Sequence, residues 1–194
     1  MSDIYELQNN KRKKNADKIL YEYGLWDFLS KIGQPHIIGS YRMDLMAWND
    51  LDLDIENSSM SREKLYQLTS FVLDVFHPLW YEAKEEVNDE GKRVWFHGFY
   101  VLIDGELWNV DLWFFDLETI SKAEAYCDRI SSAVGNSPVY RERIFRIKDA
   151  LREKGLYGFY QYSSMDVYRA VLEFGVQDSE ELLAKFAKPK SVSD

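Results

Sequence analysis

The sequence contains a single cysteine, Cys127, and no long apolar run. One thiol cannot form a disulfide within the chain, which favours a reducing compartment. No apolar stretch approaches the roughly 18 residues that a membrane-spanning helix needs. The first residues, MSDIYELQNNKRKK, lack the basic-then-apolar order of a signal peptide. We therefore expect a cytoplasmic protein with no membrane partner.

Positive charge is also scarce, because 24 Lys and Arg residues face 33 Asp and Glu residues, for a formal net charge of -9. Nucleic acids are bound non-specifically through cationic surfaces, so this balance disfavours nucleic acid as a partner. The densest basic run, KRKK at residues 11–14, is interpreted as a solvated helix end. An acidic surface is compatible with a cationic substrate or with metal ligands, and composition does not choose between them.

The composition is that of a folded protein, with 46% hydrophobic and 29% charged residues. We expect the polar residues 1–14 to be loose. Apolar periodicity and turn residues predict the other elements. Helices are predicted over 16–31, 40–47, 119–132, 138–154, 165–174 and 179–186, and strands over 36–38, 51–55, 79–87, 94–103 and 107–115. A further helix, capped by Ser59 or Ser61, is predicted from the helical spacing of Leu65, Leu68, Val72, Leu73 and Phe76. This order predicts an α+β domain over residues 1–118 and a helical domain over 119–194.

Three aspartates, Asp50, Asp52 and Asp54, alternate with aliphatic residues in the segment DLDLDIE. Residues two apart share one face of a strand, at a backbone spacing of about 7 Å. Such carboxylates raise one another's pKa unless a cation offsets their charge, and oxygen ligands suit Mg²⁺. A solvated edge strand is at least as good an interpretation of this motif alone. An EF-hand loop is rejected, because its sixth position would hold Ile55 instead of glycine.

A Gly-Ser pair precedes this strand. Gly39 has no side chain, so the backbone can approach a ligand closely, and the Ser40 hydroxyl with nearby N–H groups suits a phosphate. Alone, the pair is better interpreted as an ordinary strand-to-helix turn with a serine cap. A phosphate site beside a metal-holding carboxylate pair is suited to moving a phosphoryl or nucleotidyl group, which depends on positioning and charge neutralisation.

Gly39-Ser40, nine further residues and then Asp50-Leu51-Asp52-Leu53 resemble the signature of the nucleotidyltransferase superfamily. This is the DNA polymerase beta-like group, which includes small antibiotic and minimal nucleotidyltransferases. The resemblance implies a mixed sheet with flanking helices and a third carboxylate on a later neighbouring strand. The segment LWNVDLWFF supplies that carboxylate as Asp111. The match covers roughly residues 36–115.

The resemblance implies a metal site. Asp50 and Asp52 would hold one or two Mg²⁺ ions, and Asp111 would complete the site, accept the proton of the attacking hydroxyl, or do both. Asp52 and Asp54 also fit the signature as the metal pair. We favour Asp50 and Asp52, because Asn49-Asp50 resembles the usual entry into this strand.

The resemblance also implies a nucleotide site, in which Gly39 and Ser40 hold the leaving phosphates. Arg42 stands close to them and could reach a phosphate, although a surface arginine is the simpler interpretation. Trp113 shares the expected face of Asp111 and could stack on a base or on the acceptor, with core packing as the alternative.

We therefore expect an enzyme that transfers a nucleoside monophosphate from a nucleoside triphosphate, such as ATP, to a hydroxyl of a small-molecule acceptor and releases pyrophosphate. An antibiotic is one acceptor that the resemblance implies. A nucleotidyltransferase that modifies a protein or tRNA, of the toxin–antitoxin type, is an alternative. A catalytically silent nucleotide-binding or interaction module is another. Small enzymes of this kind often pair, which leaves a homodimer open.

Overall fold

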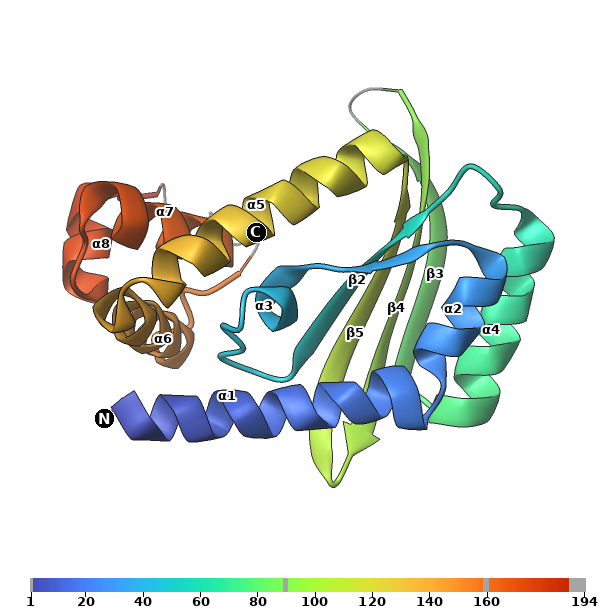
Figure 1. Cartoon of the computed structure of the whole chain (residues 1–194), viewed down its shortest axis with the longest axis horizontal. Coiled ribbons are helices and arrows are strands. Elements are labelled where there is room, and N and C mark those ends of the chain that lie inside the picture. The colour runs from blue at the N-terminus through green and yellow to red at the C-terminus, as the bar shows by residue number, and fades with distance from the viewer. Residues whose placement is uncertain (1, 89–90, 159–160, 189–194) are drawn as a thin grey trace, which may run out of the picture. The chain divides into compact units, whose positions relative to one another are not determined.

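The computed structural model describes residues 2–88, 91–158 and 161–188 (Figure 1). Contacts within the chain divide it into two compact units, one of residues 7–128 and the other of residues 1–6 and 129–194. Two long helices, α1 (Ser2–Asp17) and α5 (Leu117–Gly135), run from one unit into the other. No helix among the described residues is long and apolar enough to cross a membrane.

The larger unit is built on a five-stranded sheet with strand order β1-β2-β5-β4-β3 (Figure 1). β2 and β5 run parallel, whereas the other neighbouring strands run antiparallel. This confirms the predicted α+β fold with a mixed sheet. The strands are β1 (Pro35–Ile37), β2 (Asp50–Glu56), β3 (Trp80–Val87), β4 (Arg93–Ile103) and β5 (Glu106–Phe115). The helices of this unit, besides parts of α1 and α5, are a π-helical turn η1 (Lys18–Glu22), α2 (Leu25–Ile32), α3 (Gly39–Arg42) and α4 (Arg62–Phe76).

Alternation along the two parallel strands creates the core on one face of the sheet. The aliphatic and aromatic residues of that face are fully buried, with α2 and α4 contributing to the same cluster. They include Leu51, Leu53 and Ile55 of β2 and Val110, Leu112 and Phe114 of β5. Because successive residues of a strand point to opposite faces, the residues between them are presented on the other face of the sheet.

The N-terminal segment corrects the expectation that residues 1–14 are loose, because it forms α1. Its anchor is Asn9, which is fully buried. The amide Nδ2 of Asn9 donates to Asp44 Oδ1 at 2.8 Å, and its Oδ1 accepts from the Met46 N–H at 2.9 Å. Arg12 also donates to the Met46 carbonyl oxygen at 3.0 Å. These anchors are polar, so apolar periodicity could not reveal them.

One predicted helix is divided in the structure, and another is shorter than predicted. The helix expected over 16–31 breaks at Gly24, whose φ of +75° ends η1 and precedes α2. The helix expected over 40–47 ends at Arg42, and Asp44 follows with φ of +59°. Ile38 occupies the N-cap position of α3, so Ser40 lies within its first turn instead of capping it.

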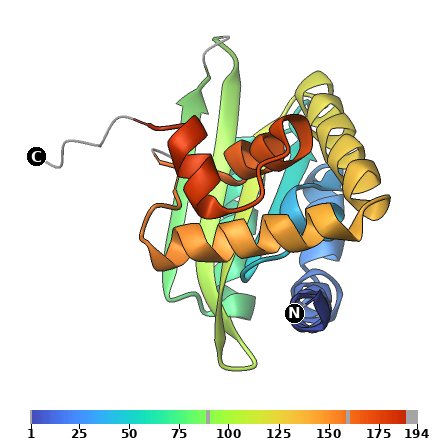
Figure 2. The same cartoon turned by 90° about the vertical axis from the view of Figure 1, so that its left-hand side faces the viewer.

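The smaller unit contains three described helices besides its shares of α1 and α5, namely α6 (Pro138–Glu153), α7 (Ser164–Phe174) and α8 (Ser179–Lys185). Figure 2 shows α7 and α8 against α6, which they both contact. Ser163 and Asp166 cap the start of α7 reciprocally, and Asp178 caps α8. All three helices lie where the sequence predicts them.

The two compact units divide at Asp128, inside α5, and the domain boundary at residue 118 stays a prediction. The first half of α5 belongs with the sheet because Glu124 binds two residues of β1 and α3. Glu124 Oε1 lies 2.8 Å from Arg42 and 3.2 Å from Nδ1 of His36. Such contacts join residues far apart in sequence, so local composition does not mark them.

Candidate functional site

Three carboxylates meet on the sheet face opposite the core. The in-register pairing of β2 with β5 sets Asp111 beside Asp52 and Asn109 beside Asp50. Asp50, Asp52 and Asp111 each offer one carboxylate oxygen, and these oxygens all lie within 4.8 Å of one another. All three side chains are partly exposed. The structure thus brings together the three residues that the sequence proposes as metal ligands.

Asn109 bridges two of these carboxylates and was not singled out in the sequence. Its Nδ2 donates to Asp50 Oδ1 at 2.8 Å and to Asp111 Oδ2 at 3.1 Å. One amide therefore orients an oxygen from each strand and offsets part of their repulsion. The available sequence signal was its spacing, because Asn109 lies two residues before Asp111 and shares its face.

Burial raises the pKa of Asp111 to about 6, and the charge of Asp50 adds to the rise, whereas the hydrogen bond from Asn109 opposes it. Phe96 and the carboxylate of Asp111 both lie close to Gly98. A Cβ at Gly98 would lie 2.5 Å from Cζ of Phe96 and 3.2 Å from Oδ1 of Asp111. The missing side chain at Gly98 thus lets the phenyl ring lie against the sheet beside the carboxylate.

Asp54 lies on the same strand but is not one of the clustered carboxylates. Its side chain is buried, at 2% exposure, and its Oδ1 has no hydrogen-bond partner among the described residues. Burial, followed by the nearby charge of Glu124, raises the pKa of Asp54 to about 7. Its backbone neighbours are His36 on β1 and Trp113 on β5, neither of which supplies a carboxylate. The geometry therefore selects Asp50 and Asp52 over the pair Asp52 and Asp54.

The Gly-Ser turn lies directly against this cluster. Gly39 has φ of +63°, and a Cβ there would lie 2.1 Å from Oδ2 of Asp52. The Ile38 N–H donates to the Asp52 carbonyl oxygen at 3.3 Å. Only glycine combines this backbone conformation with this close approach. Ser40 follows in the first turn of α3, so the structure places the Gly-Ser pair beside the carboxylates.

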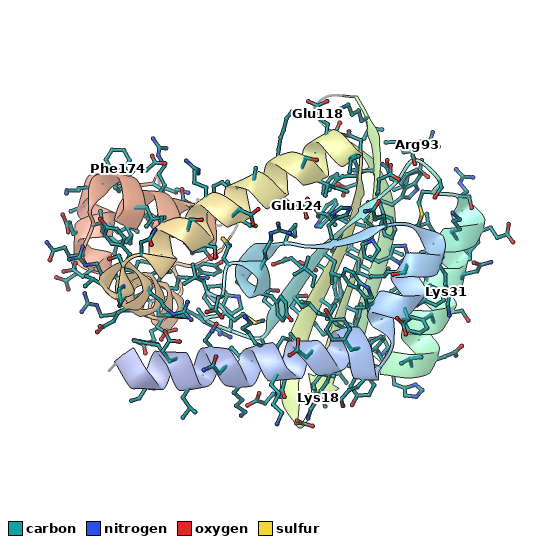
Figure 3. All side chains as sticks on the ribbon, viewed as in Figure 1. Lys18, Lys31, Arg93, Glu118, Glu124 and Phe174 are labelled. Atoms are coloured by element: carbon teal, nitrogen blue, oxygen red, sulfur yellow. The ribbon has the colours of Figure 1, made fainter. Side chains whose placement is uncertain are left out.

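Arg42 points its guanidinium at two carboxylates of α5. It contacts Asp128 through two hydrogen bonds of 2.9 and 3.1 Å and Glu124 through one of 2.8 Å. The hydrogen bond to Asp128 is the main cause that raises the pKa of Arg42. Glu124 projects from α5, where Figure 3 labels it. Arg42 also donates to the Ile37 carbonyl oxygen at 3.2 Å, and its binding to nucleotide stays a prediction.

Aromatic side chains continue the sheet face beyond Asp111. The ring of Trp113 stacks on Phe115, with centroids 5.5 Å apart, and meets Phe96 at 4.6 Å. Trp113 and Phe115 are partly exposed. Contacts with neighbouring rings cover part of the surface of Trp113 and Phe115. Stacking of a ligand on Trp113 stays a prediction.

Comparison with solved structures identifies the fold. The Cid1 poly(U) polymerase with MgGTP bound matches with a TM-score of 0.61 and 16% sequence identity, covering 100% of this chain and 62% of that one. A cytoplasmic RNA terminal U-transferase matches with a TM-score of 0.57 and 17% identity, covering 89% of this chain and 53% of that one. The polymerase core of TRAMP, an RNA surveillance complex, matches with a TM-score of 0.52 and 15% identity, covering 89% and 49%.

The predicted nucleotidyltransferase fold is thereby confirmed. The chain spans about half to three-fifths of the length of these solved structures. No protein-family model matches the chain, and no curated protein matches it in sequence.

Proposed function

We propose that this chain catalyses the transfer of a nucleoside monophosphate from a nucleoside triphosphate to an acceptor hydroxyl, with Mg²⁺ as cofactor and pyrophosphate as the second product. The observation that carries the proposal is the meeting of three carboxylates from two parallel strands beside a glycine turn. The fold, shared with polymerases and terminal transferases, supports the same chemistry.

The donor set fits a hard divalent cation. Asp50, Asp52 and Asp111 offer carboxylate oxygens within 4.8 Å of one another, and Mg²⁺ prefers oxygen ligands. When bound, the cation would neutralise charge on the phosphates and on the attacking oxygen. Asn109 would keep Asp50 and Asp111 turned toward each other while they hold it.

We assign Asp111 as the general base, which accepts the proton of the acceptor hydroxyl. Burial raises the pKa of Asp111 to about 6 in the cation-free protein, whereas a bound cation would lower it, so the assignment rests on the place of Asp111 in the carboxylate cluster. The bond that forms joins the acceptor oxygen to the α-phosphorus, and the bond that breaks releases pyrophosphate. The hydroxyl proton is transferred to Asp111, which can pass it on to solvent.

The Gly-Ser turn is the proposed place for the leaving phosphates. The backbone of Gly39 lies against Asp52, so a phosphate oxygen bound there would adjoin the metal ligands. The Ser40 hydroxyl supplies a neutral donor within the same turn. A nucleoside triphosphate is therefore the expected first substrate.

Two acceptor classes remain to be compared by experiment. The solved structures that the chain resembles act on RNA, which makes the end of an RNA chain one candidate and removes the case for excluding nucleic acid. The net charge of -9 and the negative charge of Glu82 near Asp111 favour a small neutral or cationic hydroxyl compound instead. An antibiotic is one such compound, and only the sequence resemblance suggests it.

The test measures pyrophosphate release and label transfer from each of the four nucleoside triphosphates with Mg²⁺. One reaction contains a single-stranded RNA oligonucleotide and the other a mixture of small hydroxyl compounds, including aminoglycosides and lincosamides. Asp52→Asn should abolish transfer, whereas Asp54→Asn, two residues along the same strand, should leave the metal site in place. The proposal fails if the folded wild-type protein binds no triphosphate in the presence of Mg²⁺.

A further inference from the structure

A partly open cavity of about 180 Å³ lies between α4 and the strands β3 and β4. Leu65 and Thr69 of α4 line it from one side, and Trp95 and His97 of β4 line it from the other. Trp95 and His97 alternate with Phe96 and Gly98, which adjoin Asp111. The cavity is therefore on the opposite face of the sheet from the three carboxylates, and the proposed transfer does not use it.

Hydrogen bonds at the floor of the cavity form a directed chain. The Thr69 hydroxyl donates its one proton to the Leu65 carbonyl oxygen at 3.0 Å. Thr69 must then accept from the Tyr81 hydroxyl, whose oxygen is 2.7 Å away. Because the Tyr81 hydroxyl donates its one proton to Thr69, its oxygen must accept a hydrogen bond from Nδ1 of His97 at 2.6 Å.

This chain fixes which nitrogen of His97 carries the proton. Because Nδ1 donates to Tyr81, Nε2 of the neutral ring presents a bare lone pair. Among the described residues, His97 makes its one side-chain hydrogen bond through Nδ1, and Nε2 makes none. The ring is only 1% exposed, and burial lowers the pKa of His97 to about 4, which keeps it neutral at neutral pH. A ring that lines the cavity thus carries one unused acceptor.

The surroundings of this acceptor define the chemistry of a ligand. Leu65 and the ring carbons of Trp95 offer apolar walls, and the buried Nε1–H of Trp95 has no hydrogen-bond partner among the described residues. Three charged residues, Arg62, Lys84 and Glu85, also line the cavity. Each has a partner of opposite charge, because Glu85 lies 3.9 Å from Arg62 and 2.8 Å from Arg93, and Lys84 lies 2.7 Å from Glu86. The volume suits one aromatic ring or a group of similar size. A small, mainly apolar molecule that donates one hydrogen bond matches these features.

We propose that this cavity is a second binding site, which takes a small neutral aromatic molecule whose hydroxyl or N–H group donates to Nε2 of His97. The site is independent of the transfer reaction, so either proposal can fail without the other. Phenol is the smallest probe with these features. Anisole, in which a methyl group replaces the phenol proton, is its matched control.

The first test titrates the ¹⁵N-labelled wild-type protein separately with phenol and with anisole and follows the His97 ring nitrogens by NMR. We expect phenol to bind about 2- to 10-fold more tightly, which corresponds to one net hydrogen bond. The Nε2 signal should move with phenol and not with anisole. Equal affinities, or no binding of phenol at millimolar concentration, would overturn the proposal.

The second test reverses the hydrogen-bond chain. Thr69→Val removes the acceptor of the Tyr81 proton, so Tyr81 should turn and donate to Nδ1 of His97, which moves the ring proton to Nε2. The NMR tautomer should switch, and the preference for phenol over anisole should disappear. A variant that keeps the Nδ1 proton and the phenol preference would contradict the chain.

The third test fills the cavity without touching His97. Leu65→Trp should weaken phenol binding at least about tenfold, because the larger side chain occupies the space of the ring. Leu73→Trp is the matched control, since Leu73 is exposed on the same helix and does not line the cavity. Thermal melts report whether each variant folds. If Leu65→Trp does not fold, the comparison of phenol with anisole on the wild-type protein decides the proposal.

Discussion

Gly39 lies so close to Asp52 that a Cβ at position 39 would stand 2.1 Å from the carboxylate Oδ2. Neither partner can yield cheaply, because Asp52 belongs to a paired strand and Gly39 holds φ of +63°. The turn and the carboxylate cluster therefore form one packed unit. Any side chain at position 39 must displace the carboxylate of Asp52 or the turn itself.

Replacing Gly39 with alanine tests this contact. We expect Gly39→Ala to reduce nucleotidyl transfer about 100-fold, which is the usual scale for an ångström-sized displacement of a catalytic group. Gly105→Ala is the matched control, because Gly105 also has positive φ, +78°, and meets no atom within 4 Å. Both variants carry the backbone cost of alanine at positive φ, so only the difference between them reports on Asp52.

Activity and melting temperature are measured for both variants. Equal loss of activity in Gly39→Ala and Gly105→Ala would mean that backbone strain explains the effect. The close packing of the turn against Asp52 would then have no part in catalysis.

Metal binding separates Asp52 from Asp54. Mn²⁺ serves as a paramagnetic probe that prefers the same oxygen ligands as Mg²⁺. We expect Asp52→Asn to weaken Mn²⁺ binding at least about tenfold, because it removes one of three clustered carboxylates. Asp54→Asn should bind Mn²⁺ as the wild-type protein does, since Asp54 is buried outside the cluster.

Electron paramagnetic resonance titration gives both affinities directly. The opposite result, in which Asp54→Asn loses Mn²⁺ and Asp52→Asn retains it, would move the metal site two residues along β2. A loss in both variants would mean that Asp54 supports the metal site although it lies outside the carboxylate cluster.

Short-range spacing was enough to place Asp50, Asp52 and the strand that carries them, because strand periodicity is a local property. The meeting of Asp111 with Asp52 is different. It depends on a parallel pairing between β2 and β5, whose register no local pattern specifies, and only the resemblance to known enzymes led to it. Asn109 was missed because its spacing from Asp111 indicates a shared face but not a bond to Asp50 on another strand, and its bridge between the two carboxylates is plain only in three dimensions.

Arg42 also shows that sequence position alone does not predict the partners of a charged side chain. Its position near Gly39 made it a candidate phosphate ligand, yet its partners Glu124 and Asp128 come from a helix more than eighty residues later in the chain. The expectation that residues 1–14 are loose was wrong for a related reason, because polar contacts to residues 44 and 46 hold this segment in place. Sequence patterns report burial of apolar groups well and report specific polar pairing poorly.

The buried amide of Asn9 is therefore a measure of how firmly the N-terminal helix is held. Asn9→Ala leaves the Met46 N–H and the Asp44 carboxylate without their amide partner, and we expect unfolding free energy to fall by about 2 kcal/mol. Asn10→Ala is the control, because Asn10 is the exposed neighbour on the same helix. Urea denaturation of both variants measures the difference, and equal stability would mean that α1 contributes little to the fold.

The stability of the protein in mild acid tests whether the buried ring of His97 is neutral in the folded state. Burial lowers its folded-state pKa from 6.5 to about 4, so between these values the unfolded chain binds a proton that the folded chain does not. Stability is therefore lost as the pH falls from 6.5 toward 4, by about 2 kcal/mol at pH 5 for this group alone. His97→Phe removes the titrating ring, and Tyr81 can still donate to Thr69.

We expect His97→Phe to lose less stability than the wild-type protein between about pH 7.5 and pH 5. Urea denaturation at the two pH values measures the change within each protein, which cancels the constant effect of exchanging imidazole for phenyl. Other carboxylates and histidines titrate in both proteins alike, so the difference of the two changes isolates His97. Identical changes would mean that His97 is protonated as easily in the folded chain as in the unfolded one. Its Nε2 would then carry a proton in mild acid, and the lone pair that faces the cavity would be lost there.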